Sequence, residues 1–207
     1  MRSPLLIAAA ILFGISCYFY VGAQAMRARL LTLDRQQASQ FKSGDEVRVV
    51  GVIDGDELSV QKRNGQRTVV RLLGVKTFSK SGNDIQYGRY AKLSSEYLAA
   101  HAVGKWAKVT VGKTAMDKRG RLLAFLDLTR GASDTGVAIT DLGQALIMRG
   151  FAVVFTKYPF AREQAYLQSE TKAIKEKQGL WANEIMTGRV NAFRVMWDEF
   201  RQEQESK

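Results

Sequence analysis

Two neighbouring segments of the chain combine residues suited to metal or phosphate chemistry. Segment 51–60, GVIDGDELSV, places Asp54 and Asp56 in a tight acidic turn. Carboxylate oxygens in such a turn can hold a hard cation or polarise a phosphate. Segment 71–80, RLLGVKTFSK, adds no acid; it supplies Arg71, Lys76, Thr77 and Ser79. The pair therefore contains part of a metal site together with groups that attract an anion.

The composition narrows the remaining chemistry. Cys17 is the only cysteine of the 207 residues, which excludes disulfide frameworks and cysteine metal sites. His101 is the only histidine, and a lone histidine does not support a histidine triad or a multi-histidine metal site. The formal net charge is +11, of which +10 lies after residue 26 because Arg2 is the only earlier charge. This charge favours nucleic acid, an acidic membrane surface or an acidic protein as partner.

Short β-rich segments and longer helical segments must position these residues. Strands are predicted at 46–53, 57–62, 67–75, 106–112 and 121–129, the second and third joined across Asn64-Gly65, a pair typical of hairpin turns. Helical periodicity predicts helices at 88–104, at 139–150 and from Pro159 to about residue 178. Five short strands with helical insertions indicate an α+β protein with a small closed barrel.

A further amphipathic helix is predicted near the C-terminus, within 189–207. Val190, Phe193, Trp197 and Phe200 recur at i, i+3, i+7 and i+10 and form one apolar face. This face either folds back on the domain or docks onto a partner through Phe193, Trp197 and Phe200.

The N-terminal segment is long and uncharged. Between Arg2 and Arg27 lie 24 uncharged residues, which as a helix would extend roughly 36 Å and cross a bilayer. We therefore expect a single-pass transmembrane anchor at residues 1–26, embedded through residues 3–26. We prefer it to a cleaved signal peptide, for which Ala23-Gln24-Ala25 offers a cleavage pattern.

The rest of the chain divides into three parts. Residues 27–44 are predicted to form a polar helical or flexible connector, residues 45–182 the domain, and residues 183–207 a helical extension. The first acidic residue is Asp34, so the beginning of the chain is basic and poor in acids. An internal mitochondrial targeting signal requires the same composition. We prefer the mitochondrial inner membrane to a bacterial cytoplasmic membrane, and the flanking charges leave the orientation open.

Motifs along these elements resemble one family. In order and approximate spacing, the staphylococcal nuclease, or thermonuclease-like, domain matches VIDGDELSV, RTVVRLLGVKT, YGRYA, GKWAKV, DKRGRLLAFL, LIMRGFAVV and KEKQGLW, over about residues 46–181. The resemblance implies an OB-type five-stranded barrel with three helices, and Ca²⁺-dependent cleavage of DNA and RNA in active members. It implies a metal carboxylate at Asp56 with Asp54 in support, a metal-binding carbonyl at Thr77, phosphate arginines at Arg71 and Arg121, and a pocket tyrosine at Tyr158.

The sequence departs from the family pattern at the position of one metal ligand and at that of the general base. Where the family shows VDTPE, this chain shows VKTFS: Lys76 replaces the second metal carboxylate, Phe78 the proline and Ser79 the water-positioning glutamate. An ammonium about 4 Å from a divalent cation costs on the order of 8 kcal/mol at an effective dielectric near 20. A serine hydroxyl is no general base near neutral pH. We therefore expect no intact catalytic set and no cofactor: Asp56 and Thr77 are remnants of the metal site, and Arg71, Arg121, Lys76 and Ser79 of the catalytic one.

Two hypotheses concern the converted site. In the first, Lys76 takes the place of the metal and pairs with Asp56; a rescuing acid at Asp84 is the weaker alternative. In the second, the retained cations form an anion or nucleic-acid site, with contacts from Arg71, Lys118, Arg121 and Tyr158.

The preferred function is a membrane-anchored, catalytically degenerate nuclease-like domain. It would act as a structural or accessory subunit of a membrane protein complex, with the barrel surface and the C-terminal helix as docking faces. One alternative is an anchored Ca²⁺-dependent nuclease whose missing acids come from elsewhere. The other is a non-catalytic nucleic-acid-binding module, which we do not favour.

Overall fold

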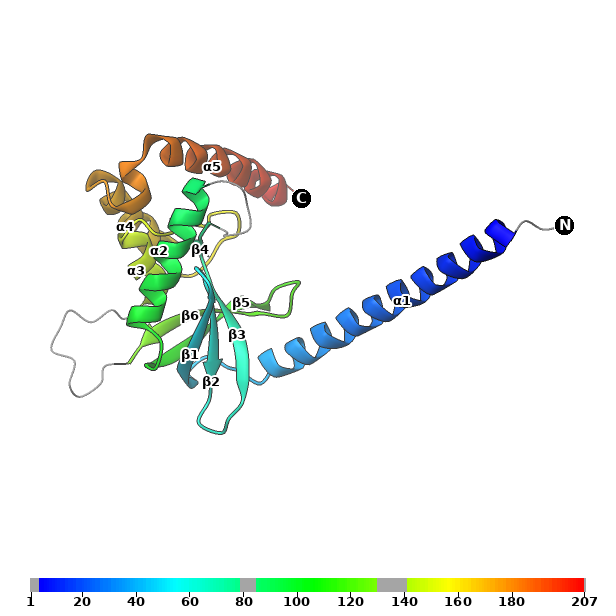
Figure 1. Ribbon diagram of the computed structural model, residues 1–207. Helices are drawn as coiled ribbons and strands as arrows, with labels where there is room; N and C mark the ends of the chain where they lie inside the picture. The colour runs from blue at the N-terminus through cyan, green and yellow to red at the C-terminus, as the bar shows by residue number, and fades with distance from the viewer. Residues whose placement is uncertain (1–3, 79–84, 130–140, 207) are drawn as a thin grey trace.

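A closed barrel of five strands lies at the centre of the protein (Figure 1). The computed structural model describes residues 4–78, 85–129 and 141–206, with residues 4–11 and Gln86 described by backbone alone. The barrel strands are β1 (Glu46–Asp54), β2 (Glu57–Gln61), β3 (Arg67–Leu72), β5 (Trp106–Met116) and β6 (Leu122–Leu128), in the order β1-β2-β3-β6-β5. β3 and β6 run parallel and the other neighbours antiparallel. This architecture confirms the prediction of an α+β protein with a five-stranded barrel of the OB type.

Alternating side chains explain the barrel. In β3, buried and more exposed residues alternate, and Val70 and Leu72 point inward. Inward-facing Val47, Val49 and Leu58 of β1 and β2 are fully buried with them. The expected turn at Asn64-Gly65 joins β2 to β3, and Gly65 has φ 89°, a conformation that favours glycine.

Three helices and a second small sheet accompany the barrel. The helices are α2 (Ile85–His101), α3 (Leu142–Met148) and α4 (Glu163–Lys175); β4 (Val75–Lys76) pairs with β7 (Val153–Val154). The expected start of the third helix at Pro159 is wrong, because the helix begins at Glu163. Phe160 lies before it and packs against Phe125 and Tyr166, so that turn is held by the core instead.

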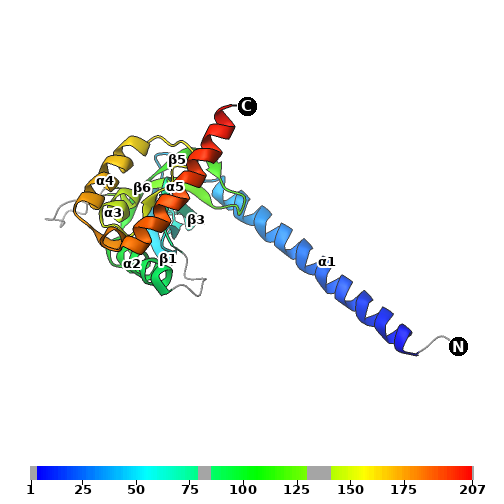
Figure 2. The same cartoon turned by 90° about the horizontal axis from the view of Figure 1, so that it is seen from above.

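The C-terminal helix folds back on the domain. A short 3-10 turn, η1 (Gly179–Ala182), leads into α5 (Glu184–Glu205), which runs diagonally past α3 and α4 and over the strands when seen from above (Figure 2). Val190 and Trp197 are buried in one cluster with Leu180 and Met186, and Phe193 packs against that cluster. Of the two alternatives for this face, packing within the chain is the one observed, because burial leaves Trp197 only 7% exposed.

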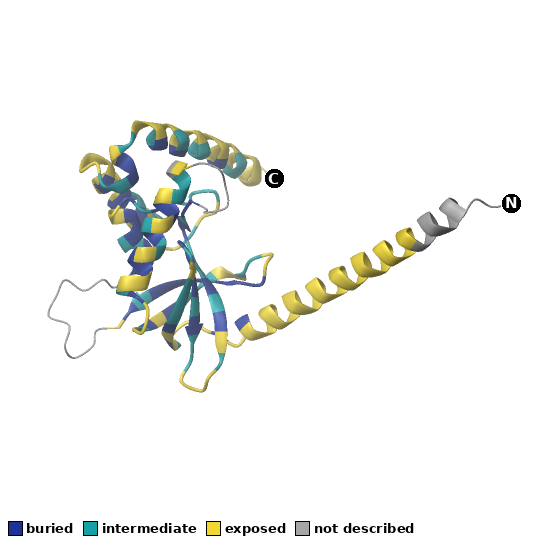
Figure 3. Ribbon diagram, viewed as in Figure 1, coloured by how far each residue is buried: buried dark blue, intermediate teal, exposed yellow. Residues whose placement is uncertain are grey.

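A helix of 35 residues, α1 (Pro4–Ala38), projects from the base of the barrel (Figure 1). Its described length is exposed except at the barrel end (Figure 3), where Ala38 and the following Phe41 are buried in the core. Lys62 of the β2–β3 hairpin donates to the carbonyl oxygen of Gln40 at 2.7 Å and pairs with Asp45 at 2.6 Å. The first part of the expected connector is therefore a continuation of the helix, and its end is tied to the barrel.

The transmembrane character of α1 is not supported by the described residues. Among them, no helix contains a stretch long and apolar enough to cross a membrane. The expected anchor begins in residues 1–11, whose side chains lie outside the described part of the chain.

Candidate functional site

The acidic turn between β1 and β2 lies directly against the end of β4. Asp54 caps the turn by accepting the Gly55 backbone N–H at 2.8 Å. A Cβ atom at Gly55 would lie 2.9 Å from the Thr77 hydroxyl and 2.2 Å from that of Ser94 on α2, so only glycine allows this approach. The Thr77 hydroxyl in turn hydrogen-bonds the Asp56 carboxylate. The fold thus brings together the two segments that the sequence singled out.

Asp56 is a buried carboxylate facing two cations. It is 4% exposed, and its Oδ2 lies 3.7 Å from Nε of Arg71. Burial raises the pKa of Asp56; the positive charges of Arg71 and Lys76 and the Thr77 hydrogen bond act in the opposite direction. The direct Lys76–Asp56 ion pair proposed from the sequence is not formed among the described residues, where Arg71 is the cation within 4.0 Å of Asp56. Lys76 acts on Asp56 through its charge, without direct contact.

Arg121, the second expected phosphate arginine, is engaged by two carboxylates. It is 8% exposed, and its Nη1 pairs with Glu57. Its Nε donates to Oδ2 of Asp117 at 2.7 Å, and its Nη2 pairs with the same oxygen. The Asp117 carboxylate also accepts the backbone N–H of Arg121 at 3.1 Å, which closes the turn before β6. In this geometry the guanidinium is held by two carboxylates, which occupy its N–H donors.

Glu57 was not identified as a site residue from the sequence. The structure places it at 9% exposure beside Arg121. In the strand register Glu57 pairs with Asp54 on one side and with Arg71 on the other. An acid at the first position of β2 was the available signal, but its partner depends on the fold.

The charges of this region balance. Four carboxylates, Asp54, Asp56, Glu57 and Asp117, face four cations, Arg71, Lys76, Arg119 and Arg121. Ca²⁺ needs six to eight oxygen ligands and several negative charges. The donor set does not fit that ion, because cations already act on Asp56. Within the described ranges no group of three or more histidine, cysteine, aspartate or glutamate side chains is arranged to hold a metal.

Phe78, which follows Thr77, belongs to a second hydrophobic cluster. It is 6% exposed and stacks on Tyr87 of α2 with ring centres 5.0 Å apart. The guanidinium of Arg189 of α5 lies over the same Tyr87 ring, 4.7 Å from the ring centre. Phe78 also shares a cluster with Val190 of α5. The residue in place of the family's proline is therefore a contact between the site and the C-terminal helix. Ser79 and Asp84 lie outside the described residues.

The other expected contact residues are spread over the surface. Lys118 is exposed on the turn before β6. Tyr158 is 56% exposed, and its ring packs edge-on against Phe155 at 6.0 Å and Phe200 of α5 at 5.5 Å. Phe193 stacks on Trp197 with ring centres 6.0 Å apart. The aromatic residues expected to meet a partner thus contact one another and the domain.

Comparison with known proteins agrees with the barrel fold. Residues 69–183 match the family described as Staphylococcal nuclease homologue. The thermonuclease of Staphylococcus hyicus is 28% identical over 136 residues, which cover 66% of this chain and 75% of that protein. The thermonuclease of Staphylococcus intermedius is 28% identical over 139 residues, 67% of this chain and 80% of that protein. Since the family match covers more than half of the chain, the protein belongs to the staphylococcal nuclease homologue family.

Proposed function

We propose that this chain is a non-catalytic member of its family that acts as a structural or accessory subunit of a membrane protein complex. The observation that carries the proposal is Lys76, an ammonium at the position of a metal carboxylate, which acts on the buried Asp56 together with Arg71. A divalent cation placed beside Asp56 would meet both positive charges.

The second support comes from Arg121. A phosphate arginine must offer free N–H groups to an anion, and this one gives them to Glu57 and Asp117. Releasing it would leave two poorly exposed carboxylates without their partner, which is costly. The charges that served phosphate chemistry in relatives here serve the internal stability of the barrel.

Membrane attachment is supported by the surface of α1. Large apolar side chains are exposed on all its sides, among them Leu12, Phe13, Tyr18, Phe19, Tyr20, Val21 and Met26. A helix that is apolar all round is buried in protein or lipid, in contrast to a surface helix with one apolar stripe. We propose the mitochondrial inner membrane ahead of a bacterial cytoplasmic membrane as the location.

A Ca²⁺-dependent nuclease is the second candidate, and the thermonuclease relatives favour it. Hydrolysis of labelled DNA and RNA by the full chain in detergent, with Ca²⁺ and with a chelator, separates the two. We expect no Ca²⁺-dependent cleavage. Cleavage that Asp56→Ala abolishes, and that the exposed α5 control Asp198→Ala retains, would establish the nuclease and overturn our proposal.

The same preparation tests nucleic-acid binding without cleavage. A binding module would show an affinity for single strands that falls steeply with salt and weakens in Lys118→Ala. We expect no such binding at low salt. The subunit role predicts that the native protein elutes from detergent-solubilised membranes in a complex of fixed stoichiometry; elution as a free monomer would contradict it.

A further inference from the structure

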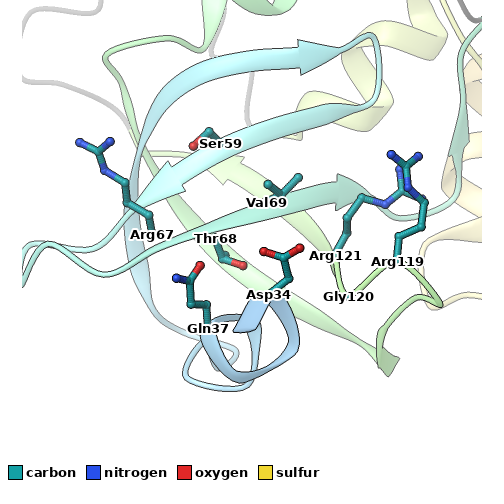
Figure 4. Close-up of a pocket in the computed structure, with 9 residues that line it drawn as sticks. All are labelled: Asp34, Gln37, Ser59, Arg67, Thr68, Val69, Arg119, Gly120 and Arg121. Atoms are coloured by element: carbon teal, nitrogen blue, oxygen red, sulfur yellow. The ribbon is translucent and has the colours of Figure 1, made fainter. Parts of the chain in front are cut away.

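A cavity of about 130 Å³, lined by both polar and apolar atoms, separates the end of α1 from the barrel (Figure 4). Asp34 and Gln37 of α1 form one wall, and Ser59, Arg67 and Thr68 of β2 and β3 form another. The turn that holds Arg119 closes the end. This face of strands 2 and 3 is where barrels of the OB type bind ligands. The cavity adjoins the Asp56 region through Arg119 and Arg121, but Asp56, Arg71 and Lys76 do not line it.

The walls of the cavity are fixed against each other at Gly120. This residue has φ 78°, and a Cβ atom there would lie 3.2 Å from Cβ of Asp34 and 3.3 Å from Cγ of Arg35. Ala38, one turn further along α1, is fully buried in the core. The Asp34 carboxylate is therefore presented from a held backbone, and Figure 4 shows it between Thr68 and Arg121.

Five of the polar side chains that line the cavity lack intramolecular partners, whereas Arg119 lies 3.9 Å from Glu57 and Arg121 pairs with Glu57 and Asp117. Across the described residues, no hydrogen bond or ion pair involves the side chains of Asp34, Gln37, Ser59, Arg67 or Thr68. Thr68 is only 6% exposed, so its hydroxyl has limited access to bulk water. A cavity with unpaired donors and acceptors is suited to a small polar ligand or ordered water.

The mixture of groups selects the chemistry of the ligand. Arg67 and Arg119 offer charged donors, and Ser59 and Thr68 offer hydroxyls; all of these bind the oxygens of an oxyanion. Arg121 contributes little charge because Glu57 and Asp117 engage it. Asp34 is an acceptor only, so the anion must also carry a proton to donate to it. Hydrogen phosphate carries P–O–H as well as charged oxygens, whereas sulfate at neutral pH has acceptor oxygens alone.

We propose that this cavity binds a protonated phosphate group, either free or as a small monoester, with Asp34 accepting the phosphate hydroxyl and Arg67 and Arg119 holding the charged oxygens. Sulfate would leave Asp34 facing an anionic oxygen with no proton between them. A site that hydrogen-bonds a hydroxyl strongly rejects an analogue that lacks it. The inference does not depend on whether the Asp56 site is catalytic.

Calorimetric titration of the full chain in detergent, in buffer free of phosphate and sulfate, tests the site. We expect inorganic phosphate to bind about tenfold or more tightly than sulfate. Asp34→Asn removes this preference, because an amide can donate to sulfate. Thr68→Val and Arg67→Gln weaken phosphate binding. Glycerol 3-phosphate as a third ligand, titrated below its second pKa of about 6 so that it carries P–O–H, shows whether a monoester is also accepted; binding of either protonated form supports the site.

A matched variant guards against a general charge effect. Arg63→Gln removes a cation from the same hairpin, where Arg63 packs over Trp106 at 4.3 Å. It is expected to leave the phosphate affinity unchanged. Equal binding of sulfate and phosphate, no phosphate binding, or an equal loss of phosphate affinity in Arg63→Gln and Arg67→Gln would overturn the proposal.

Discussion

The ionisation of Asp56 opposes folding. Burial raises its pKa above the ordinary 3.8, and Arg71 and Lys76 offset that only in part. A carboxyl whose pKa is raised in the folded state contributes its full stability below its unfolded pKa and loses it as pH rises through the folded value. At neutral pH the charged Asp56 therefore lowers the free energy of unfolding.

Asp56→Asn is consequently expected to raise the thermal midpoint at pH 7. The gain should shrink as pH falls toward 3.8, because the folded wild-type carboxyl, with its raised pKa, takes up its proton above that value. Thermal unfolding across this pH range is the measurement, with Asp54→Asn, half-buried in the same turn, as the matched control. A fall in the midpoint of Asp56→Asn at pH 7 would show that the Arg71 pair outweighs burial.

Arg121 should be a strong determinant of stability. Arg121→Met leaves Glu57 and Asp117 without their shared cation, and breaking a buried pair costs about 3–5 kcal/mol. Arg119→Met, at a side chain 71% exposed and 3.9 Å from Glu57, should change the unfolding free energy by less than about 1 kcal/mol. Denaturant titration compares the two; equal effects would mean that Arg121 is not held as described.

At this scale the sequence predicted which residues meet but not how they pair. Asp56, Arg71 and Thr77 come together because they sit at fixed places beside the turn at Gly55. The partner of Arg121 could not be predicted, because it depends on two irregularities in the β1–β2 register that bring Glu57 opposite Asp54. Such shifts leave no clear trace in the pattern of residue types.

At the scale of elements, a chain of contacts links α5 to β4 and Phe78. Arg194 of α5 pairs with Glu170 of α4, which is 1% exposed. Glu170 accepts the Val154 backbone N–H at 3.0 Å, and the β7 strand of Val154 pairs with β4, which contains Lys76. Phe78 adds a second link through Tyr87. α5 begins at Glu184, directly after the end of the family match at residue 183.

Truncating Trp197, which packs α5 onto the domain, should therefore increase local unfolding of β4. Trp197→Ala removes a ring that packs edge-on against Phe155 at 4.9 Å, and we expect a loss of about 3–5 kcal/mol in unfolding free energy. Hydrogen exchange should also become faster at Val75–Lys76 and in β7.

Val195→Ala is the control for this variant, because Val195 lies on the same helix at 59% exposure. We expect a change within about 0.5 kcal/mol and unaltered exchange in β4. Unchanged hydrogen exchange in β4 of Trp197→Ala would show that the stability of β4 does not depend on α5.

Elements with strong local signals were predictable from the sequence. Asn64-Gly65 fixes its hairpin because both residues tolerate the turn, and the strands on either side follow. The start of α4 was missed because Pro159 satisfies the local rule for a first turn, whereas packing of Phe160 decides the outcome. Whether the apolar face of α5 packs inward depends on contacts with distant residues such as Phe155, which periodicity does not report.

At the scale of the molecule, α1 and the barrel are joined by a rigid connection. The helix ends inside the core at Ala38, and Lys62 ties the next residues to the hairpin. A helix of 35 residues extends about 50 Å. If its apolar N-terminal part is embedded in lipid, the remainder holds the barrel at a set distance and direction from the surface.

Proline substitution tests this rigid connection. Leu33→Pro, inside α1, removes a backbone hydrogen bond and kinks the helix, whereas Leu33→Ala keeps it straight. Spin labels at Tyr18 and Lys118 should give a narrow distance distribution in the wild type and in Leu33→Ala, and a broad or displaced one in Leu33→Pro. A broad distribution in the wild type would contradict a fixed arm.

The mode of membrane attachment gives the last prediction. The part of the chain after residue 26 carries +10, so attraction to anionic lipids could by itself hold the protein at a membrane. Salt screens that attraction, with a Debye length of about 3 Å at 1 M, but does not extract an embedded helix. We expect the full chain to stay with sedimented membranes in 1 M salt and to be released only by detergent. A chain starting at Arg27 should stay in the supernatant both at low salt and in 1 M salt. Release of the full chain by salt would show that the basic surface, and not α1, makes the attachment.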